Sequence, residues 1–201
     1  MITSLLVGLA AYLIGSISSA VLTCQIMGLP DPREGGSGNP GTTNVLRLGG
    51  KKAAAITLMG DMLKGLLPTA IATIYFGSAE AISAAALGSF LGHLYPVWFG
   101  FKGGKGVATA LGAVIGASWL CGVLAAATWL AVLALGRISS LAALVTFAAV
   151  PVYLWLVLHS PLLTATSVLM SAMLYWRHKA NIKRLLRGEE PKVGKKQKPS
   201  E

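Results

Sequence analysis

The sequence predicts an all-α integral membrane protein, and its composition carries that prediction. Of the 201 residues, 54% are hydrophobic and only 12% are charged, with a mean hydropathy of +0.67. Soluble domains carry about 25% charged residues. The apolar residues form long stretches separated by polar loops, as in membrane helices. The net charge of +10 then fits loops facing anionic headgroups, so we expect a membrane-lipid environment and no nucleic-acid partner.

The distribution of charge indicates how many spans the chain makes. If the apolar stretch 107–135 turns back at 116–118, every Lys and Arg except Lys64 lies on one side of the membrane, as the positive-inside rule favours. We therefore predict seven transmembrane helices, with the N-terminus periplasmic and the C-terminus cytoplasmic. The predicted spans are 4–28, 53–76, 81–99, 107–117, 119–135, 140–158 and 162–177.

The predicted domain is a single membrane unit over residues 1–187, followed by a basic, disordered tail over 188–201. The span 107–117 is short for about 30 Å of hydrocarbon, so it is expected to be a partial or tilted element. In the second span, Asp61 and Lys64 are three residues apart and share a helix face. Charges inside a span mark either a functional site or a pair that neutralises itself, and the sequence leaves both open.

A glycine-rich segment between the first two spans is the first candidate site. It runs from Gly35 to Asn44 and continues to Arg47. Glycines allow backbone N–H groups to approach an anion, and the guanidinium of Arg47 suits phosphate. A flexible linker is the alternative. The candidate ligands are Gly36, Ser37, Gly38, Asn39, Thr43, Asn44 and Arg47.

A second segment follows the third span, where glycines alternate with lysines at Lys102, Gly103, Gly104 and Lys105. Its composition is that of a phosphate cradle, although a positive-inside loop would also contain two lysines. It does not match the GxxxxGK[ST] motif, because Gly106 follows Lys105. His93, ten residues before Gly103, is either a hydrogen-bonded interfacial residue or a general base.

A third polar group lies after the last span, where Arg177, His178 and Asn181 fall within one helical turn. The three groups together predict one or two phosphate-bearing ligands at the cytoplasmic face. No cluster of Cys, His and carboxylates has metal spacing, so neither a metal nor a cofactor is expected. An anion transporter and a non-catalytic lipid-binding scaffold remain alternatives, although no inverted repeat is evident.

The motifs resemble those of the bacterial membrane acyl-phosphate:glycerol-3-phosphate acyltransferases, the PlsY family. The similarity covers 36–47, 92–96 and 101–109 and extends over about residues 8–187. It departs in the third motif, where Ala180 stands at a position that is usually acidic.

The resemblance implies transfer of a fatty acyl group from acyl phosphate to the 1-hydroxyl of glycerol 3-phosphate. The products would be lysophosphatidic acid and inorganic phosphate, in the first acylation step of phospholipid biosynthesis. The implied location is the bacterial inner membrane, with the active site on the cytoplasmic side and the enzyme that makes acyl phosphate as a possible partner. Catalytic roles are expected for Ser37, His93 and Asn181, and substrate binding for the other candidate residues.

Overall fold

The computed structural model describes residues 1–193, and every regular element in that part of the chain is helical. A π-helical turn η1 (Ala72–Phe76) extends the third helix, and a 3₁₀ turn η2 (Val97–Phe99) follows the fourth. The helices in chain order are α1 (Ile2–Gly15), α2 (Ser19–Ile26), α3 (Thr42–Ile71), α4 (Ala79–Leu94), α5 (Val107–Ala117), α6 (Trp119–Gly136), α7 (Ser139–Leu158), α8 (Pro161–Arg177) and α9 (Lys179–Leu186).

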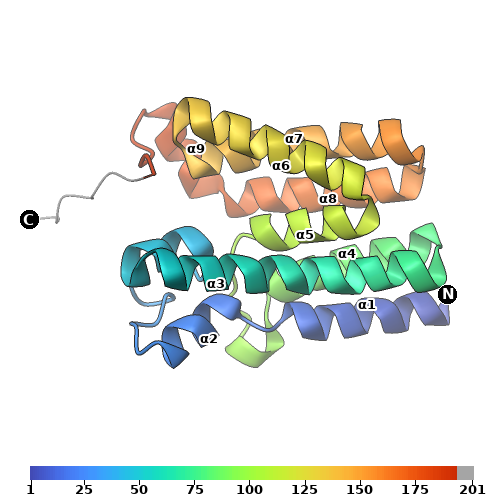
Figure 1. Ribbon diagram of the computed structural model, residues 1–201, viewed down its shortest axis with the longest axis horizontal. Coiled ribbons are helices and arrows are strands. Elements are labelled where there is room, and N and C mark those ends of the chain that lie inside the picture. Colours follow the sequence, from blue (N-terminus) through green and yellow to red (C-terminus); the bar gives the residue numbers. More distant parts are fainter. Residues whose placement is uncertain (194–201) are drawn as a thin grey trace, which may run out of the picture.

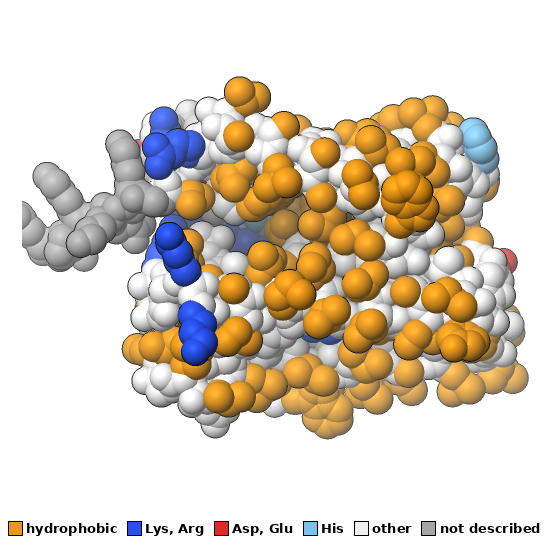
Figure 2. Space-filling view, in the orientation of Figure 1, with side chains coloured by type: hydrophobic (Ala, Val, Ile, Leu, Met, Phe, Trp, Pro, Cys, Tyr) orange, Lys and Arg blue, Asp and Glu red, His pale blue; other side chains and the backbone are white. Residues whose placement is uncertain are grey.

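The long helices run side by side and form one bundle (Figure 1). Helix α1 packs on α4, α3 on α5, and α6 on α7. The α2–α3 connection, the α6–α7 turn and α9 lie at the same end, which is the end to the left in Figure 1. Figure 2 shows hydrophobic side chains across the middle of the visible face and most of the visible Lys and Arg side chains at that end. These three connections are therefore gathered at one end of the bundle, whereas the α4–α5 connection lies nearer its middle in Figure 1.

The helices have the dimensions of membrane spans. Five segments are long and apolar enough to cross a bilayer, and they are Ile2–Ile26, Thr42–Phe76, Ala79–Phe99, Trp119–Gly136 and Ser139–Leu158. Helix α5 is a shorter apolar helix, and its 11 residues span only about 17 Å at 1.5 Å per residue. The all-helical membrane class is confirmed, whereas seven spans and the orientation of the termini stay predictions.

Two features of the first helices were not predicted. The first span is interrupted at Ser16–Ser18, where the chain leaves the helix between α1 and α2. A short helical stretch that starts at Thr42 precedes the predicted second span at 53–76, and a kink at Gly50 (φ 75°) separates this stretch from the rest of α3. Glycine tolerates this positive φ because it has no Cβ. The start was missed because Thr42–Leu48 is polar enough to be taken as a loop.

Small residues allow the central helices to come into backbone contact. A Cβ added at Gly112 of α5 would overlap the carbonyl oxygen of Met62 in α3, and one at Gly65 of α3 would overlap the carbonyl oxygen of Thr109 in α5. Close packing of this kind is a main source of helix association within lipid. It holds α5 against α3, although α5 is too short to be anchored by its own length.

We predict that Gly112→Ala destabilises the bundle by about 1–3 kcal/mol, the usual cost of overpacking a tight contact. The backbone of Met62 is rigid and cannot move aside as a flexible side chain could. Thermal unfolding of the purified protein in detergent measures the effect. Gly136→Ala is the matched control, because a Cβ there would meet only Leu141 Cδ2, at 3.7 Å. Equal unfolding temperatures for the two variants would contradict the prediction.

Candidate anion-binding active site

The segment between α4 and α5 places three buried glycines, Gly103, Gly104 and Gly106, against the end of α4. The Gly104 N–H donates to the carbonyl oxygen of His93 (3.2 Å). A Cβ on Gly104 would overlap Nε2 of His93, and one on Gly106 would overlap the ring of Phe90. Gly106 also has φ 89° where α5 begins, a conformation that favours glycine. The glycines of this predicted motif are therefore required by close packing.

Arg177, the last residue of α8, holds this glycine segment from the other side. Its Nη2 donates to the carbonyl oxygens of Gly103 (2.7 Å) and Gly104 (3.0 Å), and its Nε donates to Gly104 (3.2 Å). The planar guanidinium is suited to such multiple donation. The second and third predicted motifs thus meet through Arg177, which engages the glycine segment with three of its hydrogen bonds.

Lys105 and Asn181 form a second contact between the same motifs. Nζ of Lys105 donates to Oδ1 of Asn181 (2.5 Å). Burial lowers the pKa of Lys105 to about 8, the nearby Glu190 carboxylate opposes this, and the charges of Arg184, Arg177 and Arg47 lower it further. The positive charges of Lys105 and these three arginines are therefore close enough to repel one another, and a bound anion would reduce that repulsion.

A carboxylate that was not predicted completes the cluster. Glu190 Oε1 accepts from Ser140 Oγ (2.7 Å) and Asn181 Nδ2 (2.5 Å), and its Oε2 accepts from Arg184 Nε (2.6 Å). Burial opposes ionisation of this carboxyl, but these hydrogen bonds and the charge of Arg184 outweigh burial and hold its pKa below the usual value. Glu190 therefore stays charged at neutral pH and fixes the amide of Asn181.

The sequence contained one signal that could have identified Glu190. It is an acidic residue within the long Lys/Arg-rich run that starts at Arg177, and such a residue is a natural partner for those charges. Ala180, the residue that departs from the family pattern, is exposed. Beyond residue 187, the predicted end of the membrane domain, Glu190 and the Val193 N–H, which donates to the Arg137 carbonyl oxygen, also make tertiary contacts. The predicted disorder of 194–201 lies outside the described residues.

His178 occupies the turn between α8 and α9 and is only 3% exposed. Its Nδ1 lies 2.8 Å from the carbonyl oxygen of Leu174. Burial lowers the pKa of His178 to about 4, with the charges of Lys105 and Arg177 acting in the same direction. The side chain is therefore neutral at pH 7 and leaves the positive charge at the site to the lysine and arginines.

The first predicted motif is organised around Asn44, which is 1% exposed. Its Oδ1 accepts from the Ser37 N–H (2.8 Å), and its Nδ2 donates to the carbonyl oxygens of Pro32 and Gly35 (both 2.9 Å). Gly36 lies between these contacts with φ 63°, and a Cβ there would overlap Asn44 Oδ1. Asn44 was predicted as a ligand, and the structure uses its whole amide to shape the loop.

Most other members of the first motif are exposed, unlike Asn44. Thr43 and Arg47 lie on the first turns of α3, and both are exposed, as are Ser37 and Gly38 on the loop. Asn39 is half-buried. The motif approaches the second one where a Cβ on Gly104 would come within 3.0 Å of the Pro40 carbonyl oxygen. Lys102 is exposed, its backbone N–H donates to the Phe99 carbonyl oxygen (3.4 Å), and its side chain makes no hydrogen bond within residues 1–193.

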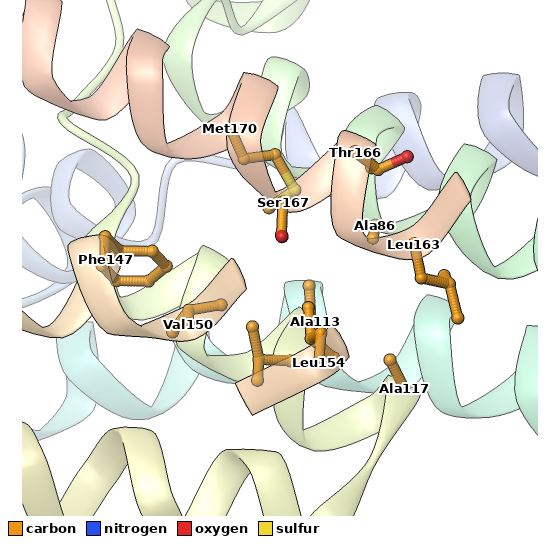
Figure 3. Close-up of a pocket in the computed structure, with 11 residues that line it drawn as sticks. Ala86, Ala113, Ala117, Phe147, Val150, Leu154, Leu163, Thr166, Ser167 and Met170 are labelled. Atoms are coloured by element: carbon orange, nitrogen blue, oxygen red, sulfur yellow. The ribbon is translucent and has the colours of Figure 1, made fainter. Parts of the chain in front are cut away.

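Two further observations concern the ligands that the described part of the chain could hold. Among the described residues, no group of three or more His, Cys, Asp or Glu side chains could hold a metal ion. A separate pocket between α4, α5, α7 and α8 is lined mainly by apolar side chains, among them Ala113, Phe147, Leu154 and Met170, and its polar members are Thr166 and Ser167 (Figure 3). No charged residue lines it, so it is suited to hydrocarbon and not to phosphate.

The fold is that of an integral membrane protein, and the candidate site is cationic and rich in glycine. A family model described as glycerol-3-phosphate acyltransferase matches residues 5–188. The chain belongs to this family, the PlsY acyltransferases.

Relatives and solved structures agree with that assignment. The chain is 57% identical over 190 residues to a glycerol-3-phosphate acyltransferase of Thioalkalivibrio sulfidiphilus, with 94% of each chain covered. It is 55% identical over 186 residues to one of Methylococcus capsulatus, with 92% of this chain and 94% of that one covered.

Two crystal structures of PlsY, described as an integral membrane glycerol 3-phosphate acyltransferase, have the same fold. Its glycerol 3-phosphate form superimposes with a TM-score of 0.90 at 38% identity, covering 95% of this chain and 96% of that one. Its lysophosphatidic acid form gives 0.86 at 36% identity, covering 95% of each.

We predict that Asn44→Ala lowers the free energy of unfolding by about 1–3 kcal/mol, because it leaves buried backbone groups of the first loop without partners. Thermal unfolding in detergent checks this. Glu34→Ala, at an exposed position of the same loop, is the control and should stay within about 0.5 kcal/mol of the parent protein. An Asn44→Ala protein as stable as the Glu34→Ala protein would show that the amide does not hold the loop.

Proposed function

We propose that this protein transfers a fatty acyl group from acyl phosphate to the 1-hydroxyl of glycerol 3-phosphate, releasing lysophosphatidic acid and inorganic phosphate. The observation that carries the proposal is the junction of Lys105, Asn181 and Arg177 around the buried Gly103–Gly104 segment. A site with this much fixed positive charge suits two phosphate-bearing substrates, and membership of the family supports glycerol 3-phosphate as the acceptor.

The chemistry needs no covalent enzyme intermediate, because an acyl phosphate is a mixed anhydride and is already activated. The 1-hydroxyl oxygen attacks the acyl carbonyl carbon and forms the ester bond. The bond from that carbon to the phosphate oxygen breaks, and phosphate leaves with the electron pair. Catalysis then consists of orienting two substrates and stabilising negative charge.

The predicted site residues divide into groups under this proposal. Ser37, Asn39, Thr43, Lys105 and the loop amides at Gly36 and Gly38 hold the head of the acyl phosphate. Arg47 and Lys102 neutralise phosphate charge, and Lys102 binds the phosphate of glycerol 3-phosphate. Asn181, whose amide is fixed by Glu190, stabilises the oxyanion that forms on the acyl carbonyl.

Two of the predicted ligands have a supporting role in this scheme. Arg177 directs its guanidinium to the carbonyl oxygens of the glycine segment, and His178 is buried and neutral at pH 7. The proton of the attacking hydroxyl goes to an oxygen of the donor phosphate. His93 is the other candidate acceptor, but it is only 7% exposed and lies behind Gly104, so the phosphate is favoured.

The site is assigned to the cytoplasmic side of the bacterial inner membrane, because the α2–α3 connection, the α6–α7 turn and α9 lie at one end of the bundle (Figure 1), where most of the visible Lys and Arg side chains also lie (Figure 2), and the positive-inside rule places such loops in the cytoplasm. The proposed topology is seven spans in a single domain. The enzyme that synthesises acyl phosphate is the proposed partner, since its product is the acyl donor and partitions to the same membrane.

The direct test is a phosphate-release assay on purified protein with palmitoyl phosphate, with and without glycerol 3-phosphate. Release should require both substrates and should fall by about 10²–10³ in Lys105→Ala, the typical loss when one transition-state donor is removed. Lys179→Ala, which removes a nearby exposed lysine, is the control. No release by folded protein that binds both substrates would favour a transporter or a scaffold.

We also predict that kcat/KM declines as the pH rises through about 8, because the free protein then loses the charge on Lys105. Since kcat/KM reports the pKa values of the free enzyme, this limb should reflect Lys105. With a pKa of about 8, the charge on Lys105 is nearly complete well below pH 8, half lost at pH 8 and absent well above it. Lys105→Arg keeps a charge at all these pH values and should shift the limb upward. An unchanged limb in that variant would assign it to another group.

A further inference from the structure

Three titratable side chains lie buried in the middle of the bundle, and the proposed reaction does not use them as reactants. Asp61 and Lys64 of α3 form an ion pair with 2.9 Å between Oδ1 and Nζ. Nδ1 of His93, near the end of α4, faces the same Asp61 oxygen at 3.5 Å. All three are at most 7% exposed. Charged groups at such depth are costly and are generally retained for a function.

One end of this cluster reaches the interruption in the first span. Lys64 Nζ donates to the carbonyl oxygen of Ile17 (2.7 Å), which lies between α1 and α2. Where a helix is interrupted, carbonyl groups lose their regular partners and need others, above all in lipid. Lys64 therefore supplies a donor that stabilises the interruption.

The other end reaches the glycine segment of the active site. The carbonyl oxygen of His93 accepts from the Gly104 N–H, and the His93 ring lies so close to Gly104 that no Cβ fits between them. The opposite side of Gly104 is held by Arg177. The position of Gly104, and with it Lys105, therefore depends on where His93 is held.

We propose that Asp61, Lys64 and His93 are positioning residues that lock the interruption of the first span and the Gly103–Gly104 segment into one geometry. This inference rests on the proposed function, because it concerns how that site is held. A pair that only neutralised itself would need no third partner, yet Lys64 also binds Ile17 and Asp61 also faces His93. A general base would need contact with the substrate, whereas Gly104 covers the imidazole.

The first test is the double variant Asp61→Asn/Lys64→Met, which leaves no buried charge unpaired. We expect it to fold but to lose about 10- to 100-fold in kcat/KM, mostly as a raised KM for palmitoyl phosphate, whose head Lys105 is proposed to bind, because misplacement of a binding group by about 1 Å can cost 10²-fold. Thr57→Val is the matched control, since Thr57 is buried on α3 four residues before Asp61 and its hydroxyl has no partner within the described residues. Parent-like kcat and KM in the double variant would overturn the proposal.

The second test separates positioning from base catalysis and serves if the double variant does not fold. In His93→Asn the amide nitrogen can replace Nδ1 facing Asp61, but it cannot accept a proton. We expect His93→Asn to retain a KM within a few-fold of the parent and His93→Ala to show the raised KM. An equal loss of kcat in both variants, with the acidic limb of the pH profile removed, would assign His93 as a base. Parent-like kinetics in both would also overturn the proposal.

A third readout needs no substrate, so it distinguishes failure of this inference from failure of the proposed function. Amide hydrogen exchange of the 100–106 segment should be faster in the double variant than in the parent or in Thr57→Val, because the Gly104 N–H loses a fixed acceptor. Unchanged exchange would contradict the inference even if acyl transfer is established. Faster exchange in a protein that releases no phosphate would support the inference and contradict the proposed use of acyl phosphate as the donor.

Discussion

A polar glycine segment within a membrane bundle is possible only if protein groups satisfy its backbone, since the hydrocarbon offers no water for this purpose. Much of the structure around the site follows from that requirement. Arg177 donates hydrogen bonds to the carbonyl oxygens of Gly103 and Gly104. The carbonyl oxygen of His93 accepts a hydrogen bond from the Gly104 N–H. The same requirement applies at the interruption of the first span, where Lys64 binds the Ile17 carbonyl.

The electrostatic balance of the site is set by one carboxylate among several cations. Glu190 binds Asn181 and Arg184, and its charge partly offsets the effect of the arginines on Lys105. The remaining excess of positive charge favours a bound phosphate. Because Asn181 contacts both Glu190 and Lys105, the orientation of its amide couples the residues after α8 to the glycine segment that leads into α5.

Close helix packing makes this arrangement possible. Helix α5 starts at the buried site and is too short to be held by its length, so its backbone contact with α3 through Gly65 and Gly112 fixes it. The same α3 carries Arg47 near its start and Asp61 and Lys64 further along. One helix therefore links the first motif, the buried polar cluster and the helix that follows the second motif, which explains why a change deep in α3 is expected to alter the proposed binding of phosphate.

The sequence by itself determined the membrane class, most helix positions after residue 79, and the three polar motifs, because hydropathy, helix-breaking glycines and clustered charges are local properties. It also suggested the family. Only the tertiary structure decided the interruption at Ser16–Ser18, the position of Gly104 against His93, and the role of Glu190. Those features depend on contacts between residues far apart in the chain, such as Lys64 with Ile17 and Ser140 with Glu190. The role of Asn44 also depends on such contacts. The composition of the glycine-rich segment suggested that Asn44 is a ligand, whereas its hydrogen bonds in the structure make it the residue that shapes the loop.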